Sequence, residues 1–242
     1  MVINGQNIKY QRNRVFGLFK FGKRDHMKEF VRSGLLYMNT LKHFRELESA
    51  DLLRSDKHEG AIHCVQADGA ILRVQHGDKW IDVGKLCGPV IGSDRSEENI
   101  NVFCMFAFRE KNSVFKVDPR NFEFGDTFVV LKDGNEFIRR VKELTARKGL
   151  KLEYNLVEYV DRSTYNGLIG KFRKFSDFSY QSEFRISIDS GKNRPYKLRI
   201  GDISDISIIG NLDELNERIK IEYSSSAKQS DSIRKLLVRI LK

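Results

Sequence analysis

An amide, a carboxylate and a guanidinium alternate along one short stretch of the chain, at Gln181, Glu183 and Arg185. Because side chains of a β-strand point alternately to opposite faces, the three groups would stand in one row, with neighbours about 7 Å apart. An ionised carboxylate in a pocket can bind a sugar hydroxyl and stabilise positive charge that develops at an anomeric carbon. An uncharged amide beside it can orient the incoming nucleophile. The spacing therefore predicts chemistry at a glycosidic bond.

The strand that must hold these groups is predicted from Tyr180 to Asp189, after an aromatic-rich loop over residues 175–180. Its second face would be apolar and would pack into a core, so that the polar face forms the wall of a cleft. Half-exposed strands also carry polar residues outward in many proteins. In that alternative, Glu183 and Arg185 are a solvated pair worth about 0–1 kcal/mol. The apolar face consists of Tyr180, Phe184, Ile186 and Ile188.

Other segments indicate what surrounds this strand. The longest apolar run, residues 100–108, predicts a central strand that is buried on both faces. Residues 15–21 predict a first strand, and residues 135–148 a helix whose core stripe is Phe137, Val141 and Leu144. Asp231 would cap a last helix, in which Ile233, Leu236, Leu237 and Ile240 recur at helical spacing.

Short strands are also predicted at residues 62–65, 70–74 and 79–83, where turn signals between them favour a meander. Strands therefore predominate, and helices do not alternate with them regularly. This pattern predicts an α+β fold of two packed, mostly antiparallel sheets with a few short helices around a central cleft. The lack of a long Gly/Ser-rich linker favours a single domain over residues 1–242.

The formal net charge of +10 suits a polyanionic partner such as RNA, DNA or an acidic protein, although it also serves solubility. A basic cluster of Lys171, Arg173 and Lys174 directly precedes the candidate strand, so we expect these three side chains to contact nucleic acid. The charged segment 54–61 is expected to be a loop, with solvation as its simplest explanation.

Several common chemistries lack their sequence signals. The chain contains no Gly-x-Ser-x-Gly, no phosphate-binding P-loop, no dinucleotide-binding glycine pattern and no His-Glu-x-x-His. Cys64, Cys87 and Cys104 are far apart and lie in no zinc spacing, which favours buried, reduced thiols in a cytoplasmic protein and no metal site. No signal core and no apolar run of about 18 residues appears, so no membrane association is expected.

The pair Gln181-x-Glu183, which opens a strand after an aromatic-rich loop, resembles the motif of the mono-ADP-ribosyltransferase superfamily. In that family, the second residue of Gln/Glu-x-Glu binds the ribose 2′-hydroxyl of NAD and promotes loss of nicotinamide, while the first residue faces the acceptor. Enzymes with Glu first tend to modify arginine, and enzymes with Gln first include modifiers of asparagine and of guanine bases in DNA. The resemblance implies catalytic roles for Glu183 and Gln181, with Arg185 holding Glu183 or a phosphate.

A wider resemblance covers about 200 residues and reaches a divergent bacterial branch of the same fold. It rests on Phe19-Lys-Phe21, Leu36-Tyr-Met-Asn39 and Phe178-Ser-Tyr-Gln-Ser-Glu-Phe-Arg185. Similar proteins are toxins of anti-phage systems, including RNA-modifying toxins of CmdTAC-type toxin–antitoxin–chaperone systems. The resemblance implies a toxin that transfers ADP-ribose from NAD to nucleic acid, with RNA favoured, and a protein antitoxin as partner.

Two of the family's NAD-binding motifs differ in this chain. The first strand offers Lys20 where an Arg or His is usual, and Phe103–Phe106 replaces a Ser-Thr-Ser motif. Arg54 is a candidate for the pyrophosphate, since a guanidinium pairs bidentately with phosphate, and a surface salt bridge is the alternative role for it. Phe19, Phe21 and Tyr37 are candidates for stacking, although core packing is the better explanation for at least one of them. The residues assigned to NAD are Lys20, Phe21, Tyr37, Asn39, Arg54 and Cys104.

Other functions remain open at the level of the sequence. The same fold could serve as a binding module for nucleic acid or protein without catalysis. A transferase with a protein acceptor is a second alternative. A nuclease is disfavoured, because no Asp/Glu/His cluster that would hold Mg²⁺ is evident in the sequence.

Overall fold

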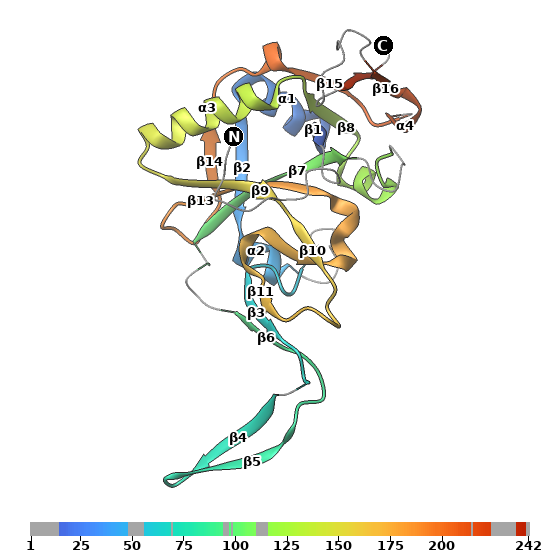
Figure 1. The fold of residues 1–242 in the computed structure, drawn as a ribbon. Helices are drawn as coiled ribbons and strands as arrows, with labels where there is room; N and C mark the ends of the chain where they lie inside the picture. Colours follow the sequence, from blue (N-terminus) through green and yellow to red (C-terminus); the bar gives the residue numbers. More distant parts are fainter. Residues whose placement is uncertain are drawn as a thin grey trace, which may run out of the picture.

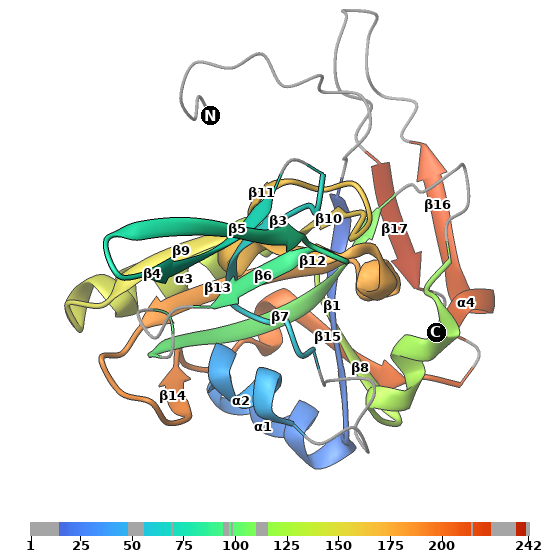
Figure 2. The ribbon, with the colours of Figure 1, turned by 90° about the horizontal axis from the view of Figure 1, so that it is seen from below.

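The computed structural model describes residues 15–47, 56–68, 70–93, 97, 99–109, 116–213, 215–223 and 236–240 (Figure 1). Its largest sheet has eight strands. The central one is β7 (Ile100–Arg109), which pairs antiparallel with β13 (Glu183–Asp189) along one edge. Its burial on both faces confirms the prediction for residues 100–108. Figure 2 shows β13 running alongside β7.

The sheet forks at the other edge of β7. There β2 (Leu35–Thr40) pairs with Asn101 and Val102, while β1 (Val15–Gly22) pairs with residues 106–109. Residues 103–105 lie between the two pairings. Beyond these strands the sheet continues through β8 (Thr127–Leu131), β15 (Ser207–Asn211), β14 (Tyr196–Arg199) and β9 (Lys151–Leu156).

Helices α1 (Arg24–Ser33) and α3 (Gly134–Arg147) contribute to the main core. Phe30 of α1 contacts Phe103 of β7 and Phe137 of α3 by its ring. The stripe of Phe137 and Val141 is buried as predicted, with Thr145 also buried. Helix α1 starts after Lys23 and is capped at its C-terminus by Gly34, whose φ of 57° suits glycine.

A second core is rich in phenylalanine. Phe19 and Phe21 of β1 pack there with Phe106, Phe108 and Phe128, and Phe19 is fully buried. The alternation of β7 separates the two cores, since Phe103 and Met105 join the first and Phe106 and Phe108 the second.

Smaller elements complete the fold. Strand β3 (Ala61–Val65) pairs with β6 (Val90–Ser93) and β11 (Gly167–Leu168), and β10 (Glu158–Val160) runs parallel to β12 (Arg173–Phe175). The short helices are α2 (Leu41–Glu46), α4 (Leu215–Arg218) and the 3₁₀ helices Pro119–Phe124, Gly170–Phe172, Ser176–Gln181 and Ser204–Ile206.

The prediction of a mixed α+β fold with mostly antiparallel strands and few helices is confirmed. The described strands form five sheets rather than two. Their pairing depends on contacts between distant segments, which strand periodicity alone does not specify.

The predicted C-terminal helix is wrong. Leu236–Ile240 is strand β17, paired antiparallel with β16 (Ile219–Tyr223), while Asp231 and Ile233 lie outside the described residues. A run of five mostly apolar residues is compatible with the periodicity of a helix and with that of a strand. Pairing with another strand decides which of the two forms.

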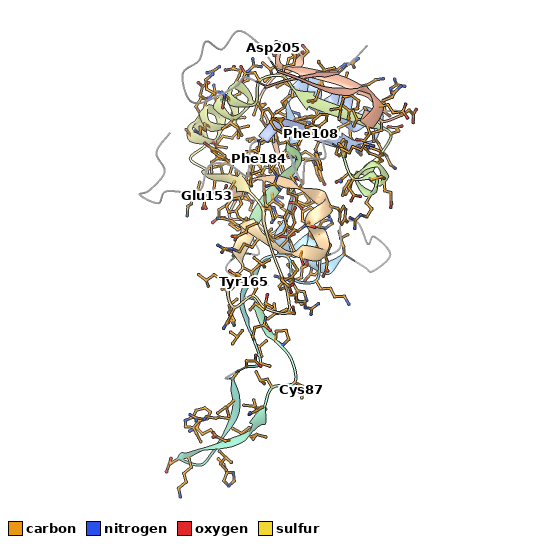
Figure 3. All side chains as sticks on the ribbon, turned by 45° about the vertical axis from the view of Figure 1, so that its right-hand side comes forward. Cys87, Phe108, Glu153, Tyr165, Phe184 and Asp205 are labelled. Atoms are coloured by element: carbon orange, nitrogen blue, oxygen red, sulfur yellow. The ribbon has the colours of Figure 1, made fainter. Side chains whose placement is uncertain are left out.

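The three strands predicted at residues 62–65, 70–74 and 79–83 are present, but the first does not pair with the second, so the predicted meander is wrong. Strands β4 (Ile71–His76) and β5 (Lys79–Lys85) form a separate two-stranded hairpin, while β3 pairs with β6. This hairpin projects from the rest of the protein (Figures 1 and 3). Every residue of its strands is exposed, including Trp80 at 65%. Cys87, near its base, is exposed rather than buried as expected.

Because no residue of the hairpin belongs to a hydrophobic core cluster, we predict that the fold does not need it. Val65 and Val90 are paired in β3 and β6, so a linker of about four Gly/Asn residues can replace residues 67–88. The melting temperature should change by no more than about 2–4 °C, equivalent to about 1 kcal/mol. Calorimetry of both proteins measures this, and a loss of cooperative unfolding would contradict it.

Candidate active site

The candidate strand begins three residues later than predicted. Residues 176–181 form a 3₁₀ helix, Ser182 has a φ of 41°, and β13 starts at Glu183. Gln181 therefore does not share the face of a strand with Glu183. The left-handed turn at Ser182 is held by a hydrogen bond from its hydroxyl to the carbonyl oxygen of Ala107, at 2.8 Å. This turn places the Gln181 amide and the Glu183 carboxylate on one side of the chain.

Five charged side chains gather where β13 begins, and we call them the charge cluster: Asp56, Glu59, Lys174, Glu183 and Arg185. Each is buried, with exposed fractions of the residue from 1% at Arg185 to 6% at Lys174 and Glu183. The predicted row of Glu183 and Arg185 therefore exists, but it is not a solvated surface pair.

Arg185 binds two carboxylates at once. Its guanidinium donates to Glu183 Oε2 at 2.8 and 3.2 Å, and to the two oxygens of Glu59 at 2.7 and 3.2 Å. A further bond reaches the carbonyl oxygen of Lys171 at 2.7 Å. The planar fork of arginine suits this bridging position. The structure thus has Arg185 hold Glu183, one of the two roles expected for it.

Lys174 Nζ donates to Glu183 Oε1 at 2.8 Å and to Gln181 Oε1 at 2.9 Å. It also forms an ion pair with Glu59 at 3.2 Å. Sequence reasoning named both Gln181 and Glu183 but placed them on one face of a strand, and it assigned the lysine that joins them to nucleic acid.

The charge cluster sets the protonation of its acids. Burial favours the neutral form of Glu183, but Lys174 and Arg185 outweigh burial and hold the pKa of Glu183 well below its usual value. The pKa of Glu59 is lowered in the same way. Burial raises this pKa, and the charge of Arg185 makes the largest contribution that lowers it. For Asp56, burial and the nearby Glu59 raise the pKa to about 6. Glu183 is therefore a carboxylate at neutral pH.

A cavity of about 790 Å³ adjoins this carboxylate. Its volume lies in the range of about 300–1,000 Å³ that small-molecule sites occupy. The cavity reaches the fork of the sheet, because Phe103, Cys104 and Met105 line it together with Glu183 and Gln181. Residues of β1, α1 and β2 line it as well.

Most residues assigned to NAD line this cavity, namely Lys20, Phe21, Tyr37, Asn39 and Cys104. Lys20 Nζ donates to the carbonyl oxygen of Cys104 at 2.7 Å, across the fork. Tyr37 is 48% exposed and is accessible for stacking, whereas the fully buried Phe19 is a core residue, as expected for at least one of these aromatics. Arg54, the candidate for the pyrophosphate, lies outside the described residues.

The thiol of Cys104 is unsuited to act as a nucleophile. Burial and the adjacent Glu183 raise its pKa to about 12, so it stays protonated. The phenol of Tyr159 accepts a hydrogen bond from the Glu183 backbone N–H at 3.0 Å, and burial raises its pKa as well. Tyr159 carried no signal in the sequence, because only the pairing of β10 with β12 brings it to this place.

The expected basic surface of Lys171, Arg173 and Lys174 is not formed as predicted, since Lys174 points inward. Lys171 pairs with Glu153 at 2.8 Å, and Arg173 pairs with Glu158 at 2.7 Å. Because successive side chains of β12 point to opposite faces, Lys174 points away from the face that carries Arg173.

The segment around Asp56 and Glu59 is likewise not a solvated loop. Both carboxylates are buried against Lys174 and Arg185, at exposed fractions of 3% and 2%. Sequence reasoning missed both residues, because a charged loop next to glycine gives no sign of a partner that lies more than 100 positions away.

Among the described residues, no three His, Cys, Asp or Glu side chains are arranged to hold a metal ion. Within the same residues, no helix is long and apolar enough to cross a membrane. Comparison with protein-family models, with curated proteins and with solved structures finds no match.

Stability should depend on pH through Asp56. Its pKa of about 6 in the folded protein exceeds the ordinary 3.8, so its stabilising contribution exists below pH 4 and is lost as pH rises through 6. Asp56→Asn keeps an oxygen for the His58 backbone N–H and removes the charge. We expect this variant to gain about 1–3 kcal/mol of unfolding free energy at pH 8 and little at pH 4.

Urea denaturation at both pH values measures this difference. Asp161→Asn is the control, because hydrogen bonds from Ser163 hold the pKa of Asp161 below its usual value, so neutralisation brings no gain at pH 8. A pH-independent effect of Asp56→Asn would refute the prediction.

Arg185 should be essential for the fold. Arg185→Met leaves the Glu59 and Glu183 carboxylates buried with one cation fewer, and we expect a loss of about 3–5 kcal/mol. Arg173→Met breaks an exposed pair with Glu158 and should cost less than about 1 kcal/mol. Equal losses in chemical denaturation would show that burial of the charge cluster is not what makes Arg185 important.

Proposed function

We propose that this chain is an NAD-dependent mono-ADP-ribosyltransferase, with Glu183 as its catalytic residue and Gln181 orienting the acceptor. One observation carries the proposal: the ionised Glu183 carboxylate lines a cavity of about 790 Å³, beside an uncharged amide. A carboxylate exposed to bulk water, or one without a cavity, would have argued against this function.

The chemistry required of these residues is limited. NAD supplies an ADP-ribosyl group whose anomeric carbon carries nicotinamide as leaving group. As that C–N bond breaks, its electron pair leaves with nicotinamide, and positive charge develops on the ribose. Glu183 accepts a hydrogen bond from the ribose 2′-hydroxyl and stabilises this charge. The acceptor then bonds to the anomeric carbon and releases its proton to solvent.

The contacts of Glu183 are compatible with this role. Its two oxygens accept three hydrogen bonds from Lys174 and Arg185. The Cys104 thiol is a further, weak donor to this carboxylate, and a ribose hydroxyl can replace it. The two cations keep the carboxylate ionised and limit its movement. Lys20, Tyr37 and Asn39 are the cavity residues that we assign to the rest of NAD.

Nucleic acid is the acceptor that we propose, with RNA preferred. The net charge of +10 attracts polyanions, and Gln181 adds no carboxylate that would attract an arginine acceptor. Lys171 and Arg173 remain candidates for phosphate contacts, while Lys174 does not. As in the divergent branch that the sequence resembles, the cellular role proposed is that of a toxin in anti-phage defence, neutralised by a protein antitoxin.

A non-catalytic binding module is the second candidate, and the charge cluster itself favours it. Buried ion pairs can be purely structural, and removal of one partner destabilises a protein whether or not it is an enzyme. The experiment must therefore separate loss of chemistry from loss of fold.

Purified protein is incubated with NAD labelled in the adenylate group, separately with RNA, DNA and lysate protein, and nicotinamide release is measured in parallel. Glu183→Gln should abolish both readouts, whereas Gln181→Ala should reduce transfer more than nicotinamide release. Asp189→Asn is the matched control: it makes the same kind of change on the same strand, outside the cavity. Thermal melts show which variants are folded.

Label transfer by the folded Glu183→Gln variant at the rate of wild type would exclude Glu183 as the catalytic residue. Absence of transfer by wild type, together with salt-sensitive RNA binding that Glu183→Gln leaves intact, would favour the binding module. Label on protein alone would retain the enzyme and replace the acceptor.

A further inference from the structure

Lys174 is enclosed where the two candidate catalytic side chains meet. It lies in β12, opposite Tyr159 of β10, and is 6% exposed. Its ammonium nitrogen is 2.9 Å from Gln181 Oε1, 2.8 Å from Glu183 Oε1 and 3.2 Å from Glu59 Oε2. The Phe178 ring lies 5.0 Å from the same nitrogen.

Two of these oxygen contacts are hydrogen bonds, and the contact with Glu59 is an ion pair. A protonated lysine has three N–H bonds and no acceptor, and four oxygens lie within 4.0 Å of its nitrogen here, the fourth being Asp56 Oδ2 at 4.0 Å. Lys174 is therefore saturated inside the protein, and a phosphate group could bind it only by displacing a carboxylate or an amide. This excludes for Lys174 the nucleic-acid contact that its position in the sequence suggests.

The same donors determine how Gln181 is oriented. A side-chain amide has one end that accepts and one that donates, and only the accepting end can face an ammonium group. With Oε1 toward Lys174, the Nε2 group faces away from it and lies 3.4 Å from the Tyr180 hydroxyl. Since Gln181 and Glu183 bind the same nitrogen, their separation is fixed as well.

We propose that Lys174 is a positioning residue for the transfer reaction: one ammonium group aligns the Gln181 amide with the Glu183 carboxylate. This inference rests on the proposed function and adds to it the group on which the geometry of the catalytic pair depends. Neither β13 nor the 3₁₀ helix 176–181 can set that geometry alone, because the left-handed Ser182 separates them.

Lys174→Met tests the proposal, since methionine fills a similar volume without donors. We expect kcat for transfer to fall by about 10²-fold, the loss expected for a misplacement of about 1 Å, while KM for NAD changes much less. Lys151→Met, which removes a lysine that is paired with Glu153 at the surface, should leave kcat unchanged. The side-chain amide resonance of Gln181, followed by ¹⁵N NMR in both variants, should move only in Lys174→Met.

A second variant keeps the proposal testable if Lys174→Met does not fold. Lys174→Met combined with Asp56→Asn removes one base and one acid, so the formal charge of the charge cluster is unchanged. Wild-type kcat in a folded Lys174 variant, or an unmoved Gln181 resonance, would overturn the positioning role while the transferase function stands. Absence of transfer and of nicotinamide release by wild type itself would instead reject the proposed function, and this inference with it.

Discussion

Two cations keep the Glu183 carboxylate ionised in a place where burial alone would neutralise it. Lys174 and Arg185 each bind one of its oxygens, and Glu59 in turn binds both cations. An unpaired buried charge is very costly, whereas a compensated cluster is tolerated when its hydrogen bonds are satisfied. The position of β13, the inward turn of β12 and the burial of the segment at Asp56 and Glu59 all depend on this compensation.

The forked sheet gives the carboxylate a cavity to act on. Because β1 and β2 leave the same edge of β7 at different heights, residues 103–105 face a gap rather than a neighbouring strand. Lys20 crosses that gap to the Cys104 carbonyl oxygen, which supplies a hydrogen bond that a regular strand pair would have provided. The cavity is thus a consequence of the topology, and its polar end coincides with the charge cluster.

The protein therefore combines a buried, tightly bonded candidate site with an exposed hairpin that lies outside the core. The chemistry that we propose requires an ionised acid next to a neutral amide, and both are held by side chains that also stabilise the fold. The hairpin β4–β5 has the opposite character, being exposed and outside the core clusters. Large apolar side chains such as Trp80 on such a projection are unusual for a surface that serves only solubility.

The sequence by itself determined the locally encoded features. The long apolar run predicted the central strand, and helical periodicity predicted the buried stripe of α3. The polar row of Glu183 and Arg185 was also evident, because alternation along a strand needs no distant partner. Whether that row faced water or a cavity could not be read from spacing.

Only the tertiary structure decided which side chains and which strands pair with one another. Glu59 and Arg185 are 126 positions apart, and no local pattern records their bond. The same holds for the inward direction of Lys174, which its basic neighbours in the sequence obscured, and for β17, whose five residues became a strand by pairing with β16. Charge compensation and strand pairing are non-local, so they emerge only when the chain is folded.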